Sequence, residues 1–109
     1  MLNTKSKGNR TQRKAIGFLE GQGAKVWLIH HTRWYKDIWG LFDGLALWKD
    51  VLVPVQIKSN RCPKMEPFIG FNKRYNIPCI VMIWRDRKDW LIKVVHDGQV
   101  SEVKHTGKY

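Results

Sequence analysis

The sequence has few acidic residues, few cysteines and no long apolar run. Its 109 residues include 9 Asp or Glu and 2 Cys, against 20 Lys or Arg. The two cysteines, Cys62 and Cys79, do not form a C-x-x-C pair, and adding the 4 histidines creates no zinc-ligand spacing. These shortages argue against a disulfide scaffold and a structural zinc site. Both cysteines are expected to fill the core of a protein in a reducing cytoplasm.

Sequence patterns of membrane and secreted proteins are missing as well. No stretch approaches the about 20 consecutive apolar residues that cross a bilayer. Residues 1–14 are basic and polar, without the apolar segment of a secretory signal. We therefore predict a cytoplasmic protein with no membrane partner. Its length suits a single domain over residues 1–109, with a basic N-terminal arm at 1–7 and a polar C-terminal tail at 99–109.

The charge balance indicates a polyanionic partner. The formal net charge is +11 and the isoelectric point is about 10.0. Such an excess of positive charge on a small surface attracts phosphate-rich polymers. With a membrane disfavoured, nucleic acid is the expected partner.

Apolar periodicity predicts the order of helices and strands. Helices are expected over residues 9–23 and 63–76, and strands over 24–31, 37–48, 51–58, 77–85 and 90–95. The order is helix, three strands, helix, two strands, which indicates an α/β fold with one mixed sheet flanked by two helices. Most tryptophans, including Trp27, Trp48 and Trp84, are expected in the core.

One group of residues has the chemistry of a phosphodiesterase. Along residues 51–58 the side chains alternate between two faces, so Gln56 and Lys58 project together from an apolar strand. Hydrolysis of a phosphodiester needs a divalent cation, and hard cations take oxygen ligands. The Asp43 carboxylate, the Gln56 amide oxygen and the Ile57 backbone carbonyl supply such oxygens. Lys58 can orient water or stabilise the transition state.

These residues resemble the signature of a known superfamily. Asp43, twelve intervening residues and Gln56-Ile57-Lys58 are similar to the D…(D/E)-x-K pattern of PD-(D/E)XK nucleases. Residues 7–13, KGNRTQR, are similar to the K-G-S-x-x-E-R opening of archaeal Holliday junction resolvases, and residues 36–43 to the D-x-x-G-x-x-D entry of short phage and archaeal relatives. The resemblance covers roughly residues 7–98.

The resemblance implies a fold, an activity and a site. It implies a restriction-endonuclease-like αβββαβ core in one nuclease domain, and a Mg²⁺- or Mn²⁺-dependent endonuclease that acts on branched, Holliday junction-like DNA as a homodimer. The catalytic residues it implies are Asp43, Gln56, Lys58, Gln12 and Asp37. The metal ligands it implies are Asp43, Gln56, Ile57 and Asp37.

Two positions depart from the family pattern. The glutamate of the first helix falls on Gln12, and the acid of the D/E-x-K element falls on Gln56, so two anionic ligands become neutral amides. A metal held by fewer charges should bind more weakly. Asp37 or Glu20 would restore an anionic ligand if either reached the site.

Basic residues around this group are the expected nucleic-acid contacts. Some flank the start of the first helix, where the helix dipole also favours phosphate, and others lie in an aromatic loop or follow Lys58. The predicted set is Lys7, Arg10, Arg13, Arg33, Lys36, Asn60 and Arg61.

Two other interpretations fit the same sequence. The chain could keep the nuclease fold but have lost the metal through Gln12 and Gln56, and would then bind nucleic acid with a steep salt dependence without cutting it. Alternatively, it could be a small basic nucleic-acid-packaging or ribonucleoprotein component of another fold, in which the Asp43, Gln56 and Lys58 pattern is accidental.

Overall fold

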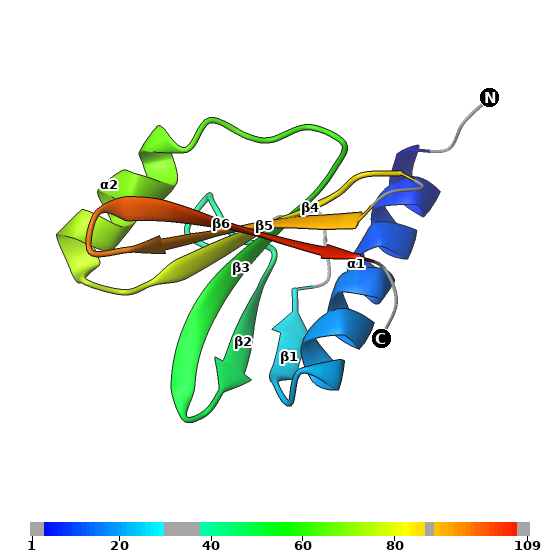
Figure 1. Ribbon diagram of the computed structural model, residues 1–109, viewed down its shortest axis with the longest axis horizontal. Helices are drawn as coiled ribbons and strands as arrows, with labels where there is room; N and C mark the ends of the chain where they lie inside the picture. The colour runs from blue at the N-terminus through cyan, green and yellow to red at the C-terminus, as the bar shows by residue number, and fades with distance from the viewer. Residues whose placement is uncertain (1–3, 30–37, 87–88, 107–109) are drawn as a thin grey trace.

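A computed structural model describes residues 4–29, 38–86 and 89–106, and the side chains of residues 10–29, 38–86 and 89–103. The chain order is α1 (Thr4–Gly21), β1 (Lys25–Leu28), β2 (Gly44–Trp48), β3 (Val51–Ser59), α2 (Glu66–Tyr75), β4 (Cys79–Trp84), β5 (Asp89–His96) and β6 (Gln99–Thr106). Figure 1 shows a twisted sheet with the two helices at opposite ends of the molecule.

The strands form one mixed sheet. Their spatial order is β1-β2-β3-β4-β5-β6, and β3 pairs with β4 in parallel while the other neighbours are antiparallel. A parallel pair needs a long crossover, and α2 provides it between β3 and β4. The predicted α/β fold, one mixed sheet flanked by two helices, is confirmed.

The end of the chain differs from the prediction. The segment expected as a polar tail at residues 99–109 contains β6, which pairs with β5 from His96↔Gln99 to Asp89↔Thr106. Asp97 and Gly98 connect the two strands with φ values of 54° and 72°, as a tight hairpin turn requires. β6 lies at the edge of the sheet and most of its described residues are exposed. Its sequence is therefore polar and lacks the apolar alternation that predicts a strand.

The helix boundaries also shift. α1 begins at Thr4 rather than residue 9, so residues 4–7 of the predicted N-terminal arm are helical. It ends close to the predicted position, where Gly23 adopts a φ of 92° and the Ala24 N–H donates to the Leu19 carbonyl. α2 begins at Glu66 rather than at residue 63, because Pro67 takes the first turn.

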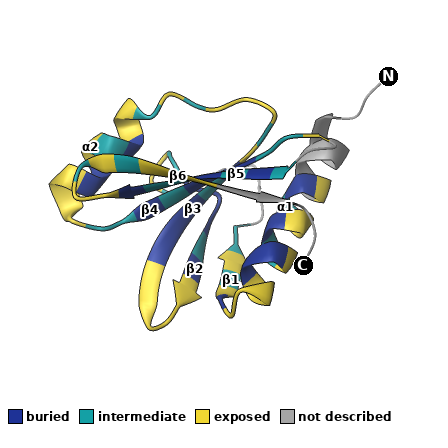
Figure 2. Ribbon diagram, in the orientation of Figure 1, coloured by how far each residue is buried: buried dark blue, intermediate teal, exposed yellow. Residues whose placement is uncertain are grey.

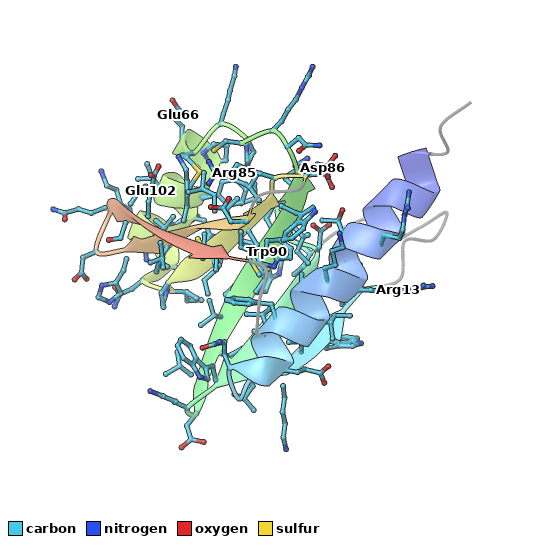
Figure 3. All side chains as sticks on the ribbon, turned by 45° about the vertical axis from the view of Figure 1, so that its right-hand side comes forward. Arg13, Glu66, Arg85, Asp86, Trp90 and Glu102 are labelled. Carbon is cyan, nitrogen blue, oxygen red and sulfur yellow. The ribbon has the colours of Figure 1, made fainter. Side chains whose placement is uncertain are left out.

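The helices cover opposite faces of the sheet. On one face, Phe18 and Leu19 of α1 pack with Val55 and Met82. On the other, Phe68 and Phe71 of α2 pack with Phe42 and with neighbouring strand residues of the opposite parity, Val81, Ile83 and Val95. Figure 2 shows buried residues along the central strands and in both helices. Figure 3 shows Trp90 between the sheet and α1, where its ring lies 6.2 Å from that of Phe18.

Several residues expected in the core lie at the surface. Trp27 is 65% exposed on the face of the sheet away from α1, and Trp48 is 40% exposed at the end of β2 on the face that α1 covers. Cys62 is exposed as well, whereas Cys79 is buried as predicted. Burial raises the pKa of the Cys79 thiol to about 11, so this group stays protonated at neutral pH. In the described part of the chain, no helix is both long and apolar enough to span a bilayer.

Gly44 allows β1 and β2 to approach each other. A Cβ at this position would lie 2.5 Å from the Trp27 carbonyl oxygen and would also overlap the Leu28 side chain. Backbone cannot give way as a flexible side chain does, so a larger residue must separate the strands. Gly44 therefore fixes the start of β2, immediately after Asp43.

We predict that Gly44→Ala lowers the free energy of unfolding by about 1–3 kcal/mol, the usual cost of overpacking. Chemical denaturation monitored by circular dichroism measures the change. The matched control is Gly70→Ala in α2, where an added Cβ meets no atom within 4 Å and should be neutral or stabilise by up to about 1 kcal/mol. Equal stability of the two variants would contradict the close approach.

Candidate active site

Asp43 is held in the sheet just before β2 begins. Its N–H donates to the Val55 carbonyl at 2.8 Å, and its carbonyl accepts from the Ile29 N–H at 2.9 Å. The backbone is thus tied to β3 on one side and to the segment after β1 on the other. The residue is only 7% exposed, so its carboxylate is largely removed from bulk solvent.

The Asp43 carboxylate is bound by two groups of β3. Its Oδ2 accepts a hydrogen bond from the Ile57 backbone N–H at 2.8 Å. The Gln56 amide nitrogen, oriented by its partners, donates to the same Oδ2 at 3.1 Å and to the Leu41 carbonyl oxygen at 2.7 Å. Hydrogen bonds from these donors compensate for burying the charged oxygen.

The Gln56 amide can turn either end toward this site. With the nitrogen inward, it bridges the oxygens of Leu41 and Asp43. Half a turn of the amide would bring its oxygen to the same place, so that three oxygens would converge with no hydrogen between them. A hard cation stabilises such an arrangement, since it takes carboxylate and carbonyl oxygens as ligands.

Neighbouring groups of β3 complete the arrangement. An extended residue directs its N–H and C=O to the same side of the strand, so the Ile57 carbonyl faces the strand edge where its N–H binds Asp43. Lys58 projects from the same face of β3 as Gln56, because side chains two residues apart share a face. Lys58 is exposed, so its ammonium group is accessible to a solvent-borne anion.

These oxygens fit a weakly bound hard cation. Across the described ranges, no cluster of three or more His, Cys, Asp and Glu side chains could hold a metal. The donor set at Asp43 is one carboxylate plus neutral carbonyl oxygens, which suits Mg²⁺ or Mn²⁺ in type but supplies little negative charge. The amide of Gln56, in place of a second carboxylate beside Asp43, accounts for this shortage.

Thr11 anchors α1 beside the site. Thr11 is buried, and its hydroxyl lies 2.6 Å from the Ser59 hydroxyl at the end of β3. Gln12 is next to Thr11 in α1 and is half-buried. Glu20 lies nine residues after Thr11, about 13.5 Å further along the helix axis. Glu20 therefore lies far along α1 from the Ser59 contact, and the role of Gln12 in the site stays a prediction.

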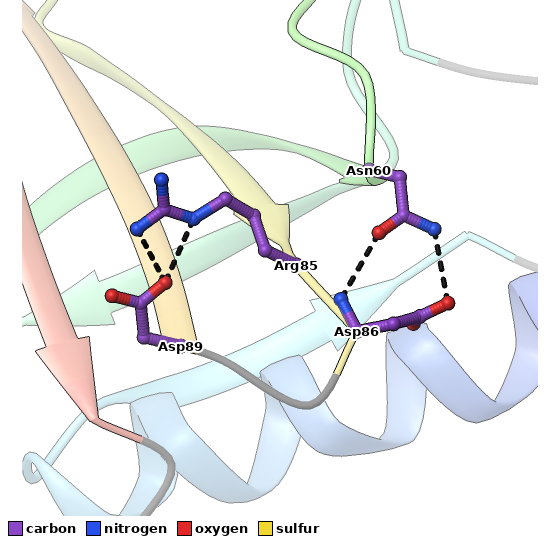
Figure 4. A network of polar contacts seen from close by, with 4 residues as sticks. All are labelled: Asn60, Arg85, Asp86 and Asp89. Carbon is purple, nitrogen blue, oxygen red and sulfur yellow. Dashed lines mark hydrogen bonds and ion pairs between the residues drawn. The ribbon is translucent and has the colours of Figure 1, made fainter.

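A polar network fixes the chain after β3 (Figure 4). Asn60 adopts a φ of 65°, its side chain donates to Asp86 Oδ2 at 3.1 Å, and its Oδ1 accepts from the Asp86 N–H at 3.0 Å. In the same turn region Arg85 binds Asp89 through its Nε at 2.7 Å. Asn60 thus ties the end of β3 to the β4–β5 connection, while Arg61 remains exposed.

Of the remaining predicted site and nucleic-acid-binding residues, some have side chains that the structure describes and others do not. Arg10 and Arg13 are exposed on α1, and Figure 3 shows Arg13 pointing away from the sheet. Asp37, Arg33 and Lys36 lie outside the described residues. Lys7 is within α1, but its side chain also lies outside them.

Comparison with solved structures identifies the architecture. The chain is similar to the 1.6 Å structure of Archaeoglobus fulgidus Hjc, a Holliday junction resolvase from an archaeal hyperthermophile, with a TM-score of 0.58 over 89% of this chain and 88% of that one. The fold is that of an archaeal Holliday junction resolvase. Sequence identity is 12%, so the likeness concerns the fold. No protein-family model matches the sequence, and no curated protein matches it.

This structural likeness excludes one alternative, the small basic protein of another fold. A basic protein of an unrelated fold is inconsistent with a resolvase-like architecture that spans most of the chain. The αβββαβ order expected from the resemblance is present, and β5 and β6 extend it.

Some groups at the site could not be found from the sequence pattern. The Leu41 carbonyl oxygen faces the Gln56 amide. Every residue has a backbone oxygen, so the identity of residue 41 could not reveal this contact. The contact between Thr11 and Ser59 joins residues 48 positions apart, and neither belongs to the acidic pattern. Only the side-chain parity of β3, with Ser59 on the face of α1, pointed to such a contact.

We predict that Gln56→Glu destabilises the protein in the absence of divalent cations, by about 1–3 kcal/mol, because a second carboxylate would face Asp43. Thermal unfolding in EDTA measures the loss, and Mn²⁺ should restore more stability to this variant than to the wild type. The exposed Gln22 provides the control, since Gln22→Glu should change neither value. An unaltered melting temperature for Gln56→Glu in EDTA would show that the two side chains are not adjacent.

Proposed function

We propose that this protein is a metal-dependent endodeoxyribonuclease that hydrolyses phosphodiesters in branched DNA. The observation that carries the proposal is the convergence of the Asp43 carboxylate, the Gln56 amide and the Leu41 carbonyl beside Lys58, on a resolvase-like fold. The net charge of +11 supports DNA as the partner.

In the proposed hydrolysis, the cation and the side chains have different roles. A bound Mg²⁺ or Mn²⁺ neutralises phosphate charge and makes hydroxide available at neutral pH. Asp43, Gln56 and the Ile57 carbonyl would hold it, with the Leu41 carbonyl as a further oxygen. Lys58, on the solvent side of β3, would stabilise the negative charge that builds up on the phosphate.

The remaining cations would position the DNA. Exposed Arg10 and Arg13 lie on α1, and exposed Arg61 follows β3. Arginine binds phosphate through two parallel hydrogen bonds, which fixes the backbone without reading the base sequence. A four-way junction has two equivalent strands to cut, so we infer a homodimer with one site for each strand.

We predict that Asp43→Asn and Lys58→Ala each reduce cleavage of labelled four-way junctions in Mg²⁺ or Mn²⁺ at least about 100-fold, in line with the loss of one group that stabilises transition-state charge. The initial rate is measured by gel electrophoresis on junction, flap, duplex and single-stranded DNA. Junction DNA should be cut fastest.

Matched controls come from the opposite end of β3. Asp50→Asn and Lys49→Ala alter an exposed acid and an exposed lysine in the β2–β3 turn, so they should retain wild-type rates. Cleavage that survives Asp43→Asn would contradict the proposal.

A second candidate is a nucleic-acid-binding protein that has lost catalysis. The observation that favours it is the hydrogen bond from the Gln56 amide to Asp43, which satisfies the carboxylate without a cation. Tight, salt-dependent DNA binding without cutting under any metal or pH would select this function over the first.

A further inference from the structure

An aromatic groove lies beside the candidate active site. It encloses about 460 Å³ between α2 and the turn that precedes Asp43. Its lining residues are Trp39, Leu41, Pro67, Gly70, Phe71, Arg74, Tyr75 and Ile77. Leu41 belongs to both places, because it lines the groove while its carbonyl oxygen accepts from the Gln56 amide at 2.7 Å.

Trp39 is presented to solvent by an unusual turn. The Leu41 N–H donates to the Ile38 carbonyl at 3.0 Å, and the two central residues, Trp39 and Gly40, have φ values of 54° and 70°. These are features of a type I′ turn, in which asparagine is the favoured first central residue and a bulky side chain is strained. Strain of this kind gathers at functional sites.

The ring of Trp39 is supported but not covered. It stacks on Phe71, with ring centroids 5.6 Å apart and planes 24° apart, and Trp39 is still 62% exposed. The Tyr75 ring centroid lies 5.1 Å from that of Phe71, Tyr75 is 55% exposed, and the Arg74 guanidinium lies 5.5 Å from the Tyr75 ring centroid. The groove therefore combines open aromatic surface with a cation.

We propose that this groove binds an unpaired nucleobase of the DNA by stacking it on Trp39. Exposed aromatic side chains combined with arginine are the usual means of holding single-stranded nucleic acid, since every base has a π-face and every nucleotide has a phosphate. Leu41 and Asp43 are two residues apart, so their Cα atoms lie within about 7 Å of each other. A base held in the groove would place a nearby phosphate at the site.

The inference rests on the proposed function and narrows its substrate. Paired bases inside a duplex offer no free face to a protein ring. Flaps, frayed ends and branch points whose base pairs have opened do, so the groove would favour DNA in which a base next to the cut site is unpaired. A fully paired duplex would bind through its phosphates alone.

Two substitutions test the groove without disturbing the fold. Trp39→Asn removes the ring and suits the type I′ turn, which offsets the lost stacking on Phe71, so the protein should stay folded. Gly70→Leu projects a side chain from a position where nothing lies within 4 Å, and should fill the groove. The controls are Trp27→Ala, at another exposed tryptophan, and Gly17→Leu, at an equally open helical glycine.

Fluorescence anisotropy in EDTA would compare forked DNA with unpaired arms, the same fork with abasic arms, and a fully paired duplex. We expect Trp39→Asn and Gly70→Leu to weaken binding to the fork about tenfold, which corresponds to about 1.4 kcal/mol. Their affinity for the paired duplex and the abasic fork should not change, and neither control should affect any of the three.

Three outcomes would overturn the inference. In the first, wild type binds the normal and abasic forks equally well. In the second, Trp39→Asn weakens duplex and fork binding by the same factor. In the third, a wild-type dimer becomes monomeric in Gly70→Leu, which would assign the groove to a second copy of the chain.

The proposed function fails independently of the groove. If Asp43→Asn still cuts DNA while the base-dependent binding is intact, only the assignment of the active site is wrong. If cleavage requires Asp43 but binding ignores the unpaired bases, only the groove is wrong.

Discussion

The hydrogen bond from the Ile57 N–H to the Asp43 carboxylate is the interaction on which the rest of the site depends. A buried carboxylate is costly unless its charge is compensated. The first compensating hydrogen bond comes from the Ile57 N–H in the backbone of β3. This bond cannot be lost unless β3 moves away from Asp43. The second comes from the Gln56 amide, which is free to rotate and can exchange a donor for an acceptor.

This constraint determines how closely the elements must pack. Gly44 lets β1 approach β2 directly after Asp43, and Thr11 holds α1 against the end of β3. Asn60 fastens the following loop to Asp86. Each contact fixes one end of a strand that carries a functional group. The accuracy of the site thus comes from strands at the centre of the sheet rather than from loops.

The turn over residues 38–42 connects the candidate active site with the aromatic groove. It contributes Leu41 to the site, and it buries Phe42 against α2, where its ring lies 5.0 Å from that of Phe71. Trp39 stacks on the same Phe71. A ligand in the groove would therefore press on the same aromatic cluster that positions the segment before Asp43, so the two regions are coupled by packing.

The sequence predicted the central strands of the sheet better than its edge strand, its surface residues and its loop contacts. Alternation in residues 51–58 gave the parity of Gln56 and Lys58, since period-two burial is a strong local signal. β6 escaped prediction because an edge strand needs few apolar residues. The exposure of Trp27 could not be foreseen, since it depends on where α2 ends in space. The bond of Asn60 to Asp86 joins residues 26 positions apart, which no local pattern encodes.

Anomalous diffraction from crystals grown with Mn²⁺ is the most direct test of the account. We predict a manganese peak bound to the Asp43 carboxylate, with the Gln56 amide turned so that its oxygen rather than its nitrogen faces the ion. Crystals at saturating Mn²⁺ with no peak at Asp43, and with the Gln56 nitrogen still donating to that carboxylate, would contradict a metal-dependent site.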